Sequence, residues 1–91
     1  MSVLGEFRRI AADAASRLRD LDSAAARDLA NEIQAAIPMR PEELSRGAAQ
    51  ILELVEGLKP DELAEETSAR ARALDDLDRL RMMCRVVLGC G

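Results

Sequence analysis

Apolar side chains recur every three or four residues along most of this chain, and that spacing limits what the chain can fold into. In the first third of the sequence they are Val3, Phe7, Ile10, Ala14, Leu18, Leu21, Ala25, Leu29, Ile33 and Ala36. Such a period places the side chains on one face of a helix. No segment shows the alternation that is typical of a half-buried strand. The sequence therefore predicts an all-α fold.

The first helix is predicted to span about residues 2–36. Ser2 suits the N-cap position, because a serine side chain accepts a hydrogen bond from the first helical turn. Pro38 ends the segment, since the residue before a proline is pushed out of the helical region. Asp22 or Ser23 can cap a new helix, so a break near Asp22 is the alternative. Because the apolar stripe stays in phase across that point, one continuous helix is favoured.

A second helix is predicted over about residues 41–57. Pro41 suits the first turn of a helix, and the carboxylates of Glu42 and Glu43 favour the positive end of the helix dipole. The apolar positions of this helix are Leu44, Ala48, Ile51, Leu52, Val55 and Leu58. Gly57 is typical of a helix end.

A third helix is predicted over about residues 60–88. Pro60, Asp61 and Glu62 repeat the same start signal, and Gly89 is expected to stop the helix. Its stripe consists of Leu63, Thr67, Ala71 or Arg70, Leu74, Leu77, Leu80 or Arg81, Cys84 and Leu88. This spacing again predicts one buried face.

Together these segments predict a single domain, residues 1–91. We expect a small antiparallel bundle of three helices in long–short–long order, or of four helices if the first breaks near Asp22. A helix of about 34 residues would be about 50 Å long, whereas a compact domain of this size has a radius of gyration of about 12 Å. Either the first helix breaks, or the molecule is elongated and pairs with another. The 16 alanines bury little apolar area each, and a thin core favours self-association.

Histidine and most aromatic side chains, which many enzymes use, are absent from this sequence. It contains no His, Trp or Tyr, and Phe7 is its one aromatic residue. Imidazole is the usual general base and metal ligand near neutral pH. Cys84 lies on the apolar stripe and is expected in the core, and Cys90 lies in a glycine tail, so a zinc site lacks ligands. We therefore expect no enzymatic activity, no cofactor and no metal site.

Charge and hydropathy narrow the class of partner. The net charge of −4 argues against nucleic acid, which prefers a basic face. No apolar run approaches the roughly 18 residues of a membrane span, and no signal peptide is visible at the start. A cytoplasmic location is expected. Residues 41–66 carry eight acidic and two basic side chains, whereas residues 67–91 carry three acidic and five basic ones. These charges are interpreted mainly as solvated surface.

The end of the last predicted helix is apolar almost all the way round. The candidate interface residues there are Met82, Met83, Val86, Val87 and Leu88. Five apolar positions in seven residues wrap most of a helix, so they do not all fit one narrow core stripe. Methionine suits adaptable contact surfaces. Two interpretations stay open: the first two helices cover these side chains within one subunit, or a second copy or another protein does.

The long–short–long order of helices is similar to that of the AroQ-type chorismate mutases, which are intertwined helical dimers of about this length. That resemblance implies an enzyme that holds a dianionic substrate with cationic side chains from both subunits. The cationic side chains available for this role are those of Arg8, Arg9, Arg27, Arg40 and Arg46. The chain departs from the family around residues 18–22, where the leading motif is not reproduced. It departs again in the last helix, which offers no matching polar group.

A second resemblance is to the coiled-coil arm of laminin β. Residues 29–33, then Ile37 and Pro38, then residues 41–44 are similar to a proline-interrupted stretch of that arm. The resemblance covers about half of the chain.

These observations favour a non-enzymatic helical module for protein–protein interaction or oligomerisation, with self-association expected. The alternative is a small helical chaperone, inhibitor or adaptor that uses the apolar end of the last helix against a different protein. A chorismate mutase of the AroQ type is the third interpretation. No small-molecule substrate is indicated.

Overall fold

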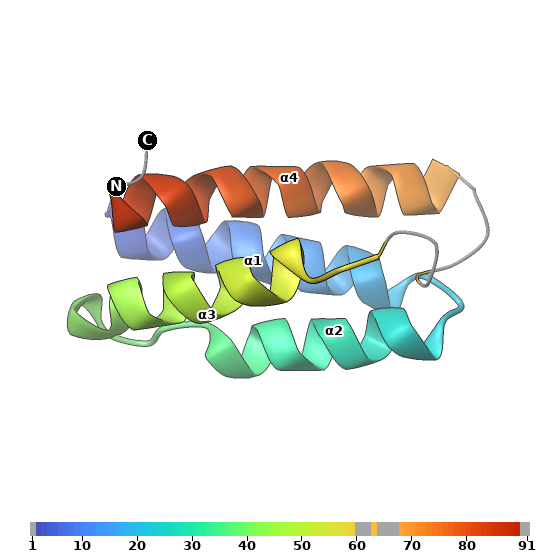
Figure 1. The fold of residues 1–91 in the computed structure, drawn as a ribbon, viewed down its shortest axis with the longest axis horizontal. Coiled ribbons are helices and arrows are strands. Elements are labelled where there is room, and N and C mark those ends of the chain that lie inside the picture. The colour runs from blue at the N-terminus through green and yellow to red at the C-terminus, as the bar shows by residue number, and fades with distance from the viewer. Residues whose placement is uncertain (1, 60–62, 64–67, 90–91) are drawn as a thin grey trace.

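The computed structural model describes residues 2–59, 63 and 68–89, and within them it shows four α-helices and one short 3-10 helix. Helix α1 spans Val3–Arg19, α2 spans Ala24–Ala36, η1 spans Pro41–Glu43, α3 spans Leu44–Glu56 and α4 spans Ser68–Leu88. Successive helices run in opposite directions, and α1 and α4 lie side by side (Figure 1). The bundle measures 37 × 23 × 22 Å. The predicted all-α bundle is confirmed, with four helices rather than three.

The favoured prediction of one continuous first helix is wrong, and the alternative break near Asp22 is what the structure shows. Helix α1 ends at Arg19, and the Ser23 side chain caps α2 by accepting a hydrogen bond from the backbone N–H of Ala26 at 3.3 Å. Leu21 is buried in the turn between the helices. A rod of about 50 Å would exceed the longest dimension of the bundle. The break instead lets α2 fold back along α1, and each helix covers the other's apolar face.

One predicted core position changes at the start of α2. Ala25 was expected to face the core, but it is exposed, and Ala26 is buried in its place. At the start of α4, Ala71 is exposed and Ala73, two positions later, is buried. Val3, at the start of the predicted stripe, is also largely exposed. Spacing alone therefore locates the buried positions near the ends of each helix only to within one or two residues.

The other helix boundaries follow their local signals closely. Ser2 caps α1 by accepting a hydrogen bond from the N–H of Gly5 at 3.0 Å. Pro41 starts the short 3-10 turn that leads into α3, and Gly57 caps the end of α3. Gly89 follows α4 with a φ of 74°, a left-handed conformation that glycine adopts without strain.

The predicted start of the third helix is wrong at the one residue that the structure describes there. Leu63 lies in a turn rather than in a helix, and its side chain is fully buried. The helix itself begins at Ser68. The remaining residues of the predicted start, 60–62 and 64–67, lie outside the described residues.

The core is apolar throughout the described part of the chain, with no buried polar or charged residue among the described positions. Its largest fully buried side chains are Phe7, Leu18, Ile33, Ile51, Leu63, Leu80 and Cys84. Eight of the 19 buried hydrophobic residues are alanines, and six of those eight lie on α1 and α2. Small side chains let these two helices approach closely, because interaxial distance depends on the residues at the contact.

Glycine serves the same purpose where α3 meets the end of α2. A Cβ atom on Gly47 would lie 2.9 Å from the carbonyl oxygen of Ala36 and 2.9 Å from the Cδ of Pro38. Only a residue without a side chain fits that contact. The loop that joins α2 and α3 is therefore held tightly against the first turns of α3.

Candidate interaction surface

The last two turns of α4 carry the five residues that the sequence singled out as a candidate interface, and the structure divides them into two groups. Met83, Val87 and Leu88 are half-buried and pack against the core. Met82 and Val86 are each 66% exposed. The two exposed residues are four positions apart, so they are neighbours on the helix surface. We call Met82, Val86 and the adjoining Met83 the α4 patch.

Met82 and Val86 of the α4 patch face away from the side of α4 that enters the core. That side consists of Ala73, Leu77, Leu80 and Cys84, which follow one another at helical spacing and are all buried. Met82 lies two residues beyond Leu80 and two before Cys84, and at about 100° per residue this places it on the opposite side of the helix. No helix of the described chain therefore packs over Met82.

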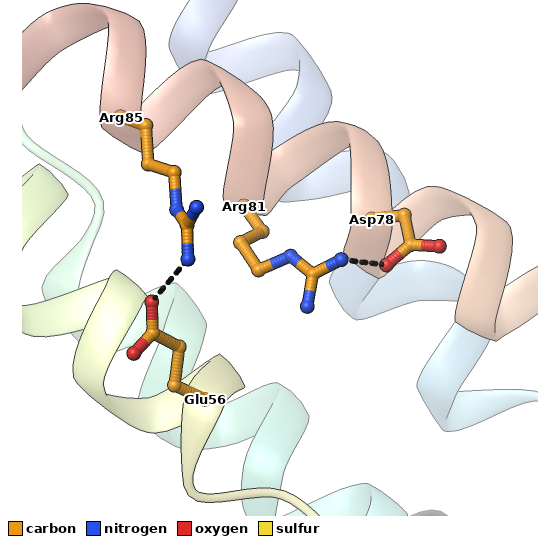
Figure 2. Close-up of polar contacts among 4 residues, drawn as sticks. All are labelled: Glu56, Asp78, Arg81 and Arg85. Carbon is orange, nitrogen blue, oxygen red and sulfur yellow. Dashed lines mark hydrogen bonds and ion pairs between the residues drawn. The ribbon is translucent and has the colours of Figure 1, made fainter. Parts of the chain in front are cut away.

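The flank of α4 that faces α3 is polar. Arg85 donates a hydrogen bond to Glu56 of α3 at 3.1 Å, and Arg81 donates one to Asp78 at 2.8 Å. Figure 2 shows the two arginines side by side above Glu56. These pairs are about half-exposed, so each contributes only a few tenths of a kcal/mol. They border an open groove of about 540 Å³ whose apolar lining includes Leu58, Leu74 and Leu77.

The flank of α4 that faces α1 is polar in one part and apolar in another. Near the end of α1, Arg17 donates a hydrogen bond to Asp76 at 2.8 Å, and this pair joins the two helices. Nearer the start of α1, Ile10 and Met83 are both half-buried and pack against the core. The polar part of this flank therefore lies toward the turn between α1 and α2, and the apolar part lies toward the α4 patch.

Exposed apolar side chains gather at one end of the bundle. Within the described residues, the large hydrophobic side chains that stay exposed are Val3, Met39, Met82 and Val86. Val3 starts α1, Met39 lies between α2 and η1, and the other two lie in the last turns of α4. Figure 1 shows that these three segments share one end of the molecule, which we call the open end. The opposite end, which contains the turn at residues 20–23, we call the turn end.

The one described cysteine has no exposed thiol. Cys84 is fully buried in the core, as its place on the stripe predicted, and burial raises the pKa of its thiol to about 11. A buried neutral thiol is a poor nucleophile, because the thiolate is the reactive form. Cys90 lies outside the described residues.

The cations that the resemblance to chorismate mutases singled out do not form one pocket. Arg8 and Arg9 line a groove between α1 and the end of α2, whereas Arg27, Arg40 and Arg46 are not among the residues that line it. Every residue that lines this groove is exposed or half-buried. The resemblance rested on a long first helix, which the structure divides into α1 and α2.

Two further observations concern metal binding and membrane crossing. Among the described residues, no group of three or more cysteine, aspartate or glutamate side chains is placed to hold a metal ion. In the same part of the chain, no helix combines the length and the hydrophobicity that crossing a membrane requires.

Comparison with known proteins adds no family. No protein-family model, no curated protein and no solved structure matches this chain.

Proposed function

We propose that this chain is a non-enzymatic helical module that binds protein through the α4 patch, with a second copy of the chain as its partner and the cytoplasm as its location. The observation that carries the proposal is the pair Met82 and Val86, each 66% exposed and adjacent on one helix face. A single exposed hydrophobic residue is ordinary on a protein surface. Exposed apolar side chains that adjoin one another in a patch are typical of a contact surface.

The break in the first helix changes the basis for this proposal. A continuous first helix would have needed cover from a second molecule along its length. The turn at residues 20–23 supplies that cover within one chain, because α2 packs on α1. The proposal therefore rests on the α4 patch rather than on the length of the first helix.

The double variant Met82→Ser/Val86→Ser tests the proposal by sedimentation at micromolar concentration. Burying each of these side chains contributes about 1 kcal/mol, so their joint loss should weaken association about 30-fold. Ala71→Ser is the matched control, because Ala71 is exposed on α4 about three turns before the patch. Both variants should keep the helical circular dichroism of the parent, because none of the three side chains is in the core.

Two results would contradict self-association through this patch. One is a parent protein that stays monomeric from micromolar to millimolar concentration. The other is a double variant that associates as strongly as the parent and the Ala71→Ser control.

A second candidate function is an adaptor that presents the same patch to a different protein. The observation that favours it is the share of methionine: Met39 and Met82 are two of the four exposed large hydrophobic residues described. Methionine is flexible and polarizable, and it suits surfaces that adapt to different partners. A monomeric parent whose α4 patch resonances shift on adding a binding protein would favour this candidate over self-association.

A further inference from the structure

Helix α2 lies between two surface grooves of nearly equal size. The α1–α2 groove has a volume of about 530 Å³, and its lining includes Arg8, Arg9 and Met39. The α2–α3 groove has a volume of about 540 Å³, and its lining includes Glu32 and Glu53. Both grooves also have apolar side chains in their lining, so each combines hydrophobic surface with charge.

The two grooves carry opposite charge. No aspartate or glutamate is among the described residues that line the α1–α2 groove, and no lysine or arginine is among those that line the α2–α3 groove. Arg9 lies 4.0 Å from Glu6, and both side chains are largely exposed, so that pair is weak. Arg8 has no ion pair with any described residue. The charges of both grooves are therefore available to an incoming molecule.

The strip of α2 between the grooves carries short side chains of its own, and Arg19 of α1 reaches it to donate a hydrogen bond to Asn31 at 3.1 Å. Ala24, Asp28, Asn31 and Ala35 follow one another at spacings of four, three and four residues, and all four are exposed. Long side chains keep a second helix at a distance, whereas short ones permit close approach. This strip by itself selects no ligand, but it allows a second surface to reach both grooves together.

We infer that the side of the bundle formed by α2 and its two grooves is a self-complementary interface for a second copy of this chain. In a two-fold symmetric dimer, residue i of one copy contacts residue j of the other, and j contacts i. The basic groove lies toward the end of α2, and the acidic groove lies toward its beginning. A two-fold axis that crosses α2 between them sets the arginines of each copy against the glutamates of the other.

Charge complementarity selects a second copy over other occupants. A purely acidic partner would fit the α1–α2 groove but would be repelled by the neighbouring one, and a purely basic partner would meet the reverse. A specific interface takes about 800 Å² from each partner, which is about one seventh of the 5807 Å² that this protein exposes.

The inference goes beyond the proposed function, because it concerns a different face. Helix α4 and helix α2 lie on opposite sides of the bundle (Figure 1). Contacts through the α2 side depend on charge and should weaken with salt. Contacts through the apolar α4 patch should not weaken with salt. Salt dependence therefore separates failure of one proposal from failure of the other.

The test uses two variants, each of which reverses the charge of one groove. The first is Arg8→Glu/Arg9→Glu, which makes both grooves acidic, and the second is Glu32→Arg/Glu53→Arg, which makes both basic. Each variant alone should lose at least about tenfold in affinity for itself, because like charges then face each other. A mixture of the two should form a one-to-one heterodimer, detected by native mass spectrometry, because opposite charges meet again in both contacts. The parent's association should fall as NaCl rises from about 0.05 M to about 0.5 M.

A control changes charge elsewhere on the surface. Arg72→Glu lies on α4, ten residues before Met82 and away from the α2 side, and should associate as the parent does. Where a reversed variant loses helix content, Arg8→Gln/Arg9→Gln or Glu32→Gln/Glu53→Gln replaces it, with a smaller loss of affinity expected. Three results overturn the inference: a parent that does not self-associate, groove variants that associate as strongly as the parent, or a mixture that forms no heterodimer.

Discussion

The two ends of this bundle differ in how completely their apolar side chains are buried. At the turn end, Leu21 is buried between α1 and α2, and Ser23 satisfies an N–H of the new helix. At the open end, four large hydrophobic side chains remain exposed: Val3, Met39, Met82 and Val86. The two ends belong to the same helices and share one core. What differs is therefore local: the turn end is closed by short-range contacts, whereas the open end leaves apolar surface for another molecule.

The largest expected difference between the two ends comes from placing an aspartate at each of them. Leu18 is fully buried near the turn end, and Leu18→Asp would leave an unpaired carboxylate in the core. We expect a loss of several kcal/mol, enough to unfold a domain of ordinary stability. Val86→Asp at the open end should change monomer stability by less than about 0.5 kcal/mol. Denaturant titration at low protein concentration measures both, and equal losses would remove the distinction between the ends.

A second substitution tests whether the open end is loosely packed beneath its exposed side chains. Gly47→Ala would place a methyl group 2.9 Å from the Ala36 carbonyl oxygen and from Pro38. Because backbone atoms form part of this contact, we expect a loss of about 1–3 kcal/mol in the free energy of unfolding. A stability within a few tenths of the parent's would show that the α2–α3 loop yields easily.

The smallest expected difference compares the two serine caps. Ser23→Ala removes the cap of α2 at the turn end and should lower stability by about 1 kcal/mol. Ser2→Ala removes the equivalent hydrogen bond from α1 at the open end, where the first turn frays more readily and the loss should be smaller. Thermal melts of the two variants at matched concentration provide the comparison. A larger effect at Ser2 would mean that the start of α1 is more firmly held than its exposure indicates.

Sequence reasoning located most of the fold because capping signals are local. Ser2, Pro41, Gly57 and Gly89 each mark the boundary that their chemistry predicts. The break at Ser23 carried the same kind of signal, but the apparent continuity of the apolar stripe outweighed it. Continuity misled because alanine occupies positions 24, 25 and 26, so a stripe drawn through any of them looks equally regular. Packing decided which of the three is buried.

The candidate surface was harder to predict than the fold. The sequence identified five apolar residues near the end of α4, and composition did not indicate that Met82 and Val86 are exposed while Val87 and Leu88 pack against the core. The grooves beside α2 were not predicted at all. They combine residues from α1, α2 and α3 that are far apart in sequence, so their opposite charges become visible only after the helices are placed.

The connectivity of the helices influences which helix–helix contact forms last during folding. The contacts α1–α2, α2–α3 and α3–α4 each join consecutive helices. Among the larger helix–helix contacts of the described residues, the one that joins helices far apart in sequence is α1–α4, which includes the ion pair between Arg17 and Asp76. Consecutive hairpins close short loops, whereas the last contact closes one loop of nearly the whole chain, with a correspondingly larger loss of chain entropy. The α1–α4 seam should therefore form last. Substitutions along it should accelerate unfolding while leaving the folding rate nearly unchanged.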